Sequence, residues 1–301
     1  MWAMPLLTNS AVPITILASG ISVDSADSTG NARFVKINHA TVTTPRIISF
    51  WFYKHSGEGV SINSSSAVTN VDPPGATTFY TLNLGVNFAG NPFLNIADFD
   101  VPGQGNQAVV LNWNDDSTGG ANPNIKEDAW NHIAFFVTNW TTGFGSSKSV
   151  RAYLNGVDQG TETDSGVSQR DARLIFTGYD YNAARLNGTF FGGDAADTVT
   201  IDDSTQYAVA NQQRYCIAQF FVGYTDDSAG SYDIQDFYQD GFAVDLGDGT
   251  NGGTQQLNPS IYQLLNYPFP LLDSATQDGL VLYDDRTTLT ANDPAFQCSN
   301  T

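Results

Sequence analysis

The side chains that could carry acid–base chemistry are few and far apart in this sequence. Among its 31 acidic residues only three are glutamates, Glu58, Glu127 and Glu162. A retaining glycosidase needs two carboxyl groups about 5 Å apart, and these three are too scattered to share one face of a strand. Glu127 precedes a predicted strand and Glu162 follows a predicted hairpin, so we expect both to be solvated. We therefore predict no catalytic residues.

The three histidines, His39, His55 and His132, do not form a recognisable site either. They lack the i, i+4 spacing of a helical zinc site. His132 stands inside the run WNHIAFFVT (130–138), where we expect a structural, hydrogen-bonded histidine. The sequence also has no phosphate loop with its lysine and no Gly-x-Ser-x-Gly elbow.

Calcium is the metal that the sequence favours, because its ligands are carboxylate, amide and carbonyl oxygens. Asp and Asn gather in the stretches NWNDD (112–116), TDD (225–227) and DLGDG (245–249). The candidate ligands are led by Asp115, Asp116, Asp226 and Asp227, with Asn112, Asn114, Asp245 and Asp248 beside them. None of the stretches has EF-hand spacing, so a solvated acidic loop is the alternative for each.

Glycan binding would need an exposed aromatic ring to stack on a sugar, with amides or carboxylates to bind its hydroxyl groups. The stretches LNWNDD (111–116) and GYDYNAAR (178–185) supply this combination. The candidate residues are Trp113, Asn114, Asp115, Tyr179 and Tyr181. Each of these aromatic residues could instead belong to the core or to a subunit contact.

Strands must position these side chains, because glutamate is rare and residues that favour turns are common. Aromatic residues make up 12% of the chain and charged residues 14%. Short apolar or alternating runs between clusters of turn residues predict an all-β antiparallel sandwich of the jelly-roll type. The predicted strands are 33–38, 46–55, 79–86, 93–99, 108–113, 131–139, 149–157, 173–179, 216–224 and 280–285. Short helices are predicted over 233–242, with Asp233 as N-cap, and over 259–265, with Ser260 as cap.

One large domain is the simplest organisation, because no long linker or repeat interrupts these runs. We expect the sandwich to occupy residues 21–290, with a tail at 291–301. Residues 1–20 are apolar, carry no charge before their apolar residues and contain Pro5 and Pro13, so we expect a docking arm rather than a secretory signal.

The net charge of −19 argues against nucleic acid and anionic membranes as partners, since both require clustered Lys and Arg. The two cysteines, Cys216 and Cys298, form no disulfide framework. We expect a buried free thiol at Cys216, although a bridge to the C-terminal tail is the alternative.

Two neighbouring runs define the predicted core. In 131–139, Ile133, Phe135 and Val137 alternate with Ala134 and Phe136, which indicates a strand covered on both faces. In 149–157 an alternating strand ends in Asn-Gly, the dipeptide that type I′ hairpin turns favour.

These runs together resemble the laminin-G-like branch of the concanavalin A-like lectin/glucanase superfamily. The resemblance rests on ISFWFY (48–53), WNHIAFFVT (130–138), VRAYLNGV (150–157) and IAQFFVGY (217–224). It implies that six residues build the core of the sandwich: Trp51, Trp130, His132, Tyr153, Asn155 and Gly156. The superfamily includes β-glucan hydrolases, but their signature, Glu-x-Asp-x-x-Glu or Glu-x-Asp-x-Glu, is missing here.

Residues 217–262 further resemble the C-terminal part of laminin-G-like proteins of tailed bacteriophages. This resemblance implies a non-enzymatic structural protein on the virion surface, either a capsid decoration or a tail or fibre component. The implied partners are other virion proteins and further copies of the chain, since a virion repeats its sites. A glycan-binding adhesin for the host surface is the alternative, and a β-glucan-cleaving enzyme is a third hypothesis.

Overall fold

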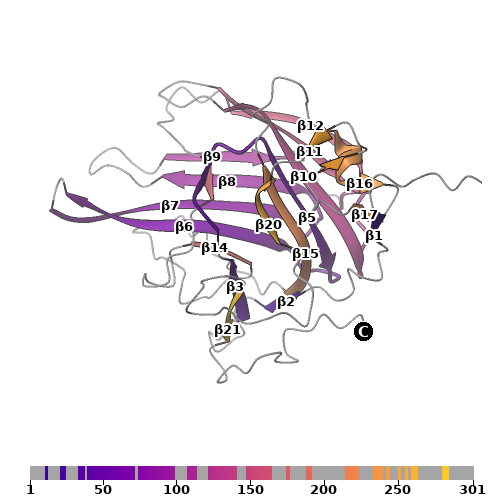
Figure 1. The fold of residues 1–301 in the computed structure, drawn as a ribbon, viewed down its shortest axis with the longest axis horizontal. Helices are drawn as coiled ribbons and strands as arrows, with labels where there is room; N and C mark the ends of the chain where they lie inside the picture. Colours follow the sequence, from indigo (N-terminus) through magenta and orange to yellow (C-terminus); the bar gives the residue numbers. More distant parts are fainter. Residues whose placement is uncertain are drawn as a thin grey trace, which may run out of the picture.

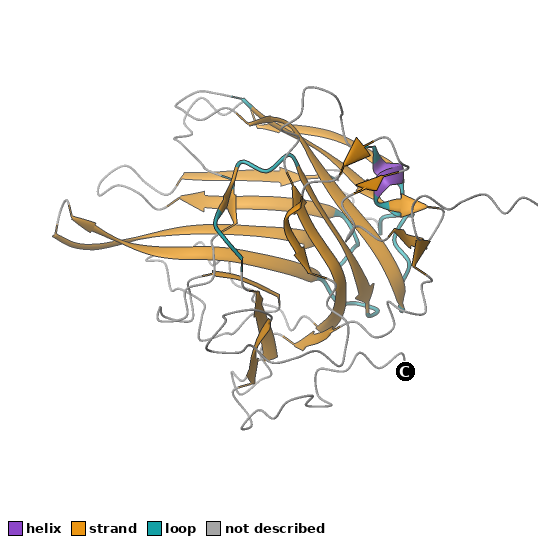
Figure 2. Ribbon diagram, viewed as in Figure 1, coloured by secondary structure: helices purple, strands orange, loops and turns teal. Residues whose placement is uncertain are grey.

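The structure is a computed structural model of the full chain. It describes residues 11–12, 21–24, 33–37, 39–71, 74–98, 107–113, 121–140, 147–164, 174–176, 188–191, 214–223, 233–239, 242–244, 250–251, 255–256, 259–263 and 280–284. Nearly all of these residues that have regular structure are in strands (Figure 2). Every strand pair is antiparallel, which confirms the predicted all-β class.

Most strands belong to one 14-stranded sheet, in which twelve follow the order β12-β11-β10-β5-β15-β2-β3-β14-β6-β7-β8-β9. Two more strands pair beside this path, β20 on β15 and β21 on β3. The bounds are β2 (Ile21–Asp24), β3 (Arg33–Ile37), β5 (Ile47–Lys54), β6 (Val60–Val71), β7 (Pro74–Val86), β8 (Pro92–Asp98), β9 (Gln107–Asn112), β10 (Ala129–Trp140), β11 (Lys148–Leu154), β12 (Val157–Asp164), β14 (Gly188–Phe191), β15 (Arg214–Gly223), β20 (Pro259–Gln263) and β21 (Leu280–Asp284).

The smaller sheets pair β1 (Ala11–Val12), β17 (Phe242–Val244) and β16 (Tyr238–Gln239), then β13 (Ile175–Phe176) with β4 (Val42–Thr43), and β18 (Thr250–Asn251) with β19 (Gln255–Gln256).

The large sheet curls so that its two ends face each other as a sandwich. We call β12, β11, β10, β5 and β15 the β5 half, and β14, β6, β7, β8 and β9 the β7 half. In Figure 1 the strands of the β7 half run across the view and those of the β5 half cross them steeply. Side chains from both halves form one core, including Phe50, Phe135, Val150, Ile62, Leu84, Leu94 and Leu111.

The two end strands approach each other at Trp113, which follows β9. Its indole Nε1 donates a hydrogen bond to the Gly160 carbonyl oxygen of β12 at 2.9 Å. This contact links the two ends of the sheet.

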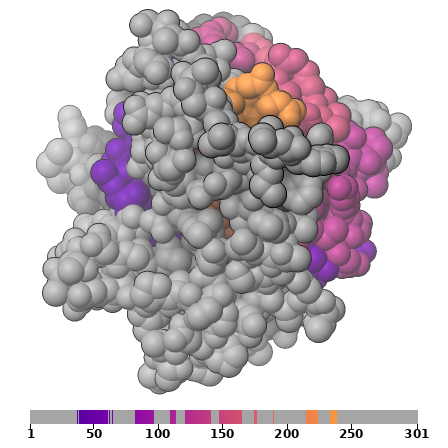
Figure 3. Space-filling view, turned by 45° about the vertical axis from the view of Figure 1, so that its right-hand side comes forward, coloured from indigo at the N-terminus to yellow at the C-terminus, as the bar shows by residue number. Residues whose placement is uncertain are grey.

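The outer face of the β5 half is also covered. Ile48, Phe50 and Phe52 of β5 point into the sandwich core, while Ile47 and Trp51 belong to clusters on the opposite face. A 3-10 turn, η2 (Ile234–Asp236), and the β1-β17-β16 sheet form the covering layer. Phe237 packs against Phe221 at a ring distance of 5.1 Å, and Figure 3 shows this segment, in orange, against the pink surface of the β5 half.

The two predicted helices need correction. The prediction over 259–265 is wrong, because residues Pro259–Gln263 form β20, which pairs with the second half of β15. The prediction over 233–242 is right only for its first turn: Asp233 caps η2 in a capping box with Asp236, and strands follow. In both places a neighbouring strand offers more backbone hydrogen bonds than a short isolated helix could make.

The prediction of a free thiol at Cys216 is also wrong. Cys216 lies buried in β15 and is disulfide-bonded. The other cysteine of the chain, Cys298, lies outside the described residues. Among the helices of the described part of the chain, none has the length and hydropathy that a membrane span requires.

Candidate functional site

His132, whose imidazole could by its type act as an acid or a base, lies on the covered outer face of the β5 half. The β5–β10 register places His132 directly opposite Trp51. We call His132, Trp51, Tyr238, Asn155 and Gly156 the His132 cluster. His132 and Trp51 are each 1% exposed, so both of these rings are closed to solvent.

Three rings pack together in the cluster. The Trp51 and His132 ring centroids are 5.1 Å apart, and Tyr238 of β16 stacks on Trp51 at 5.7 Å with an interplanar angle of 23°. Tyr238 also lies 5.6 Å from His132. Offset aromatic packing of this kind stabilises a core beyond the area that it buries. Tyr238 therefore ties the covering layer to the sandwich.

Burial determines the protonation of His132. Its Nε2 is hydrogen-bonded to the Ser49 hydroxyl at 2.8 Å, while its Nδ1 has no hydrogen-bond partner. Desolvation lowers the pKa of His132 from 6.5 to about 3. The imidazole is therefore neutral at physiological pH.

The Asn155-Gly156 turn holds the cluster in place. Both residues have positive φ, 50° and 76°, as a type I′ turn requires. The Asn155 backbone N–H donates to the His132 carbonyl at 2.8 Å, and Asn155 Oδ1 accepts from the His132 backbone N–H at 2.9 Å. A Cβ on Gly156 would lie 2.7 Å from Cδ1 of Tyr238, so the ring requires glycine at this position.

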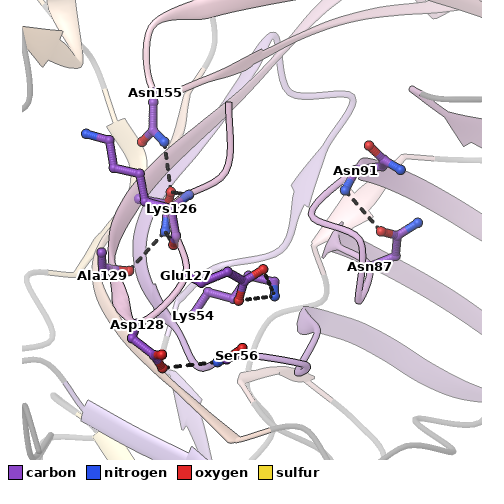
Figure 4. Close-up of polar contacts among 10 residues, drawn as sticks. Lys54, Ser56, Asn87, Asn91, Lys126, Glu127, Asp128, Ala129 and Asn155 are labelled. Carbon is purple, nitrogen blue, oxygen red and sulfur yellow. Dashed lines mark hydrogen bonds and ion pairs between the residues drawn. The ribbon is translucent and has the colours of Figure 1, made fainter. Parts of the chain in front are cut away.

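Asparagine side chains connect this turn to the loop before β10 (Figure 4). Asn155 Nδ2 donates to the Asn124 carbonyl and to Asn131 Oδ1, both at 2.8 Å. Asn131 is fully buried and bonds both backbone groups of Lys126, accepting from its N–H at 2.9 Å and donating to its carbonyl at 2.7 Å. These amides replace the ladder partners that the loop backbone lacks.

The prediction that Glu127 is simply solvated is wrong. Both of its carboxylate oxygens accept hydrogen bonds from Lys54 Nζ, at 2.7 and 2.8 Å (Figure 4). The Lys54 side chain is fully buried, whereas that of Glu127 is 39% exposed. Asp128 Oδ1 accepts from the Ser56 backbone N–H at 3.1 Å. The loop before β10 is thus held at two successive residues, by Lys54 of β5 and by the turn that follows it.

The other chemistry-capable residues do not join this cluster. Glu58 follows β5 and Glu162 lies on β12, so the three glutamates are on separate elements. Trp130 packs edge-on against Tyr53 at 5.9 Å, and the indole Nε1 atoms of Trp130 and Trp51 have no hydrogen-bond partner. Tyr153 is half-buried and contacts Phe136 at 5.2 Å.

The prediction that Trp113 stacks on a sugar is wrong. Its side chain is 5% exposed, packs on Phe135 at a ring distance of 5.4 Å, and is hydrogen-bonded to Gly160. The burial of Trp113 follows from its place in the core between the two halves. The remaining glycan candidates, Asn114, Asp115, Tyr179 and Tyr181, lie outside the described residues.

The calcium candidates Asp115, Asp116, Asp226 and Asp227 also lie outside the described residues, as do Asp245 and Asp248. Asn112 ends β9 and is exposed. Within the described ranges, no three His, Cys, Asp or Glu side chains are grouped so that they could hold a metal ion.

Sequence reasoning missed Tyr238, Lys54 and Asn131. Lys54 had a signal, because a lysine at the end of the apolar run IISFWFYK (47–54) needs a nearby acid when that strand is buried. Tyr238 had none, since its partners lie far away in the sequence.

No family model matches the chain, and no curated protein matches it. Three solved structures show weak likeness. A heptameric SAP-like pentraxin from Limulus polyphemus is 12% identical with a TM-score of 0.32, over 68% of this chain and 76% of the pentraxin. Tailspike protein 2 of Escherichia coli O157:H7 bacteriophage CAB120 is 10% identical with a TM-score of 0.32, over 86% of this chain and 28% of the tailspike. The alginate lyase Aly36B is 13% identical with a TM-score of 0.28, over 72% of this chain and 87% of the lyase. At these values none of the three carries an argument about this protein.

Proposed function

We propose that this chain is a non-enzymatic structural protein of a bacteriophage virion, a capsid decoration or a component of the tail or fibre. The proposal rests on one observation: side chains that could do acid–base chemistry make structural contacts instead. His132 packs against Trp51 and Tyr238, Glu127 binds Lys54, and Asp236 closes a capping box. These groups hold loops and layers in place, as we expect in a structural protein.

The location of the protein is proposed from the resemblance of residues 217–262 to laminin-G-like phage proteins. The disulfide at Cys216 supports an oxidising location such as a virion surface. A net charge of −19 suits a soluble outer face and not a contact with the packaged nucleic acid. Further copies of the chain and other virion proteins are the proposed partners.

Mass spectrometry of purified particles tests this function. We expect peptides of the chain to stay with density-gradient particles through high-salt washing, at a copy number set by the particle symmetry. Loss of the chain to the soluble fraction of the same lysate would contradict a structural role. Release of new reducing ends from β-glucan by the purified chain would contradict its non-enzymatic character.

Glycan binding at the host surface is the alternative function. Because Trp113 is buried, the remaining candidate residues for this function are Asn114, Asp115, Tyr179 and Tyr181. A glycan array probed with and without a calcium chelator tests it, and binding that an Asp115→Asn or Tyr181→Ala variant loses would support the adhesin.

A further inference from the structure

The β6–β7 hairpin extends beyond the body of the sandwich. β8 pairs with β7 only from Tyr80 onward, and β14 pairs with β6 only over Ile62 to Ser65. Residues 66–71 and 74–79 therefore form a two-stranded arm, which Figure 1 shows projecting past the ends of β8 and β9. At about 3.3 Å per residue the arm is roughly 20 Å long.

A two-stranded ribbon is only marginally stable in water when nothing packs beside it. The outer edge of β6 over 66–71 has no paired strand among the described residues. No strand of the described ranges pairs with the backbone N–H and C=O groups on that side, and such groups can pair with a strand of another chain.

The edges of this sheet are treated differently by the sequence. The edge strand β12 (VDQGTETD) carries Asp158, Glu162 and Asp164 and has a bulge opposite β11, and charges and bulges both block strand addition. The arm strands, SAVTNV (66–71) and PGATTF (74–79), carry no charged residue, and Asp72 stands between them in the sequence. The arm has a register shift of its own, between Asn70 and Val71, but its β6 edge lacks the charges that protect β12.

We propose that the arm pairs with the arm of a second copy of this chain, β6 against β6, in an antiparallel two-fold contact. A second copy also carries a net charge of −19, so a contact surface without charges adds no further repulsion between two copies. A neutral partner such as a glycan would not require such a surface. β6 is the better edge, because Pro74 and Gly75 weaken the edge of β7.

Two-fold antiparallel pairing is self-complementary and produces a four-stranded β7-β6-β6-β7 ribbon. The symmetry axis then passes near the middle of the edge, at Val68 or Thr69. This contact would be the surface through which copies of the chain associate, so it rests on the homo-oligomer in the proposed function. It does not depend on the virion role.

Sedimentation of the full chain and of its charge-swap variants tests the proposed contact. We expect the unaltered chain to sediment at twice the mass of the 32.4 kDa chain. Thr69→Lys and Thr69→Glu should each be monomeric, because like charges then meet across the axis. An equimolar mixture of the two variants should restore the dimer. The matched control is Thr161→Lys or Thr161→Glu on the exposed edge strand β12, which should leave the dimer unchanged.

A second variant removes the arm by joining Ser66 to the register partner Tyr80 through an Asn-Gly turn. It should be a folded monomer. A monomeric unaltered chain, a dimer that survives either change, or a mixture that fails to reassociate would overturn the arm contact. Detection of a monomeric chain in purified particles would overturn this contact alone and leave the virion role standing.

Discussion

Gly156 shows how a single residue can connect two layers of this fold. Its φ of 76° and the ring of Tyr238 both oppose a side chain. Gly57 has nearly the same φ, 77°, but no atom lies within 4 Å of the position that a Cβ would take there. We predict that Gly57→Ala costs about 1 kcal/mol of unfolding free energy from backbone strain alone. Gly156→Ala should cost about 1–3 kcal/mol more, because the Tyr238 ring must move.

Urea unfolding of both variants measures this difference. The double variant Gly156→Ala with Tyr238→Ala should show coupling, since removal of the ring relieves the clash. Equal costs for the two glycine substitutions would show that Tyr238 does not pack on the turn.

His132 makes stability depend on pH. Its pKa is about 3 in the folded chain and near 6.5 when unfolded, so the unfolded chain binds the extra proton between these values. The stabilising contribution is fully present above pH 6.5 and is lost as the pH falls toward 3. Between about pH 7 and pH 5 we expect His132 to account for a loss of about 2 kcal/mol.

Comparison with His132→Gln isolates this effect, because glutamine does not titrate. The unaltered chain should lose more unfolding free energy than the variant over this pH range, measured by urea titration at each pH. His39→Gln is the control for the other histidine whose pKa burial lowers. Parallel pH profiles for the unaltered chain and His132→Gln would contradict a buried neutral imidazole.

The position of the loop before β10 depends on the Lys54–Glu127 pair. Glu127→Gln leaves the buried Lys54 ammonium without its anion, so we predict a loss of about 1–3 kcal/mol of unfolding free energy. The loss is smaller than for a fully buried pair, because the Glu127 side chain is 39% exposed. Lys54→Met removes the buried charge itself and should cost less. Both losses are measured by denaturant unfolding.

Asp158→Asn, in the exposed Arg151–Asp158 pair, is the matched control and should change the unfolding free energy little. A larger loss for Asp158→Asn than for Glu127→Gln would contradict the importance of the Lys54–Glu127 pair.

Strands and turns with strong local signals were predictable. The alternation in β10 and the Asn-Gly turn indicated two-sided burial and a hairpin, and the structure has both. β6 was missed because SINSSSA (61–67) shows little apolar alternation, and its pairing with β7 and β14 stabilises it instead. β20 was mistaken for a helix because β15, its partner, lies far away in the sequence. The burial of Trp113 and the position of Tyr238 depend on the same kind of long-range packing.

The net charge of −19 on each copy opposes the dimer that we propose. Like-charged copies repel, and salt screens this repulsion with a Debye length of about 8 Å at physiological ionic strength. We therefore predict that the dimer becomes tighter as salt rises from low to physiological concentration, measured by sedimentation. A contact between opposite charges would weaken instead, and that outcome would contradict pairing through an uncharged arm.

If this chain is a repeated building block of a particle, as we propose, it occupies symmetry-related positions on that particle. A cryo-electron microscopy map of purified particles can locate the chain at such positions. We expect density for the sandwich at symmetry-related positions on the outer surface of the particle. A particle surface without that density, while the chain is abundant in the soluble fraction, would contradict this proposal.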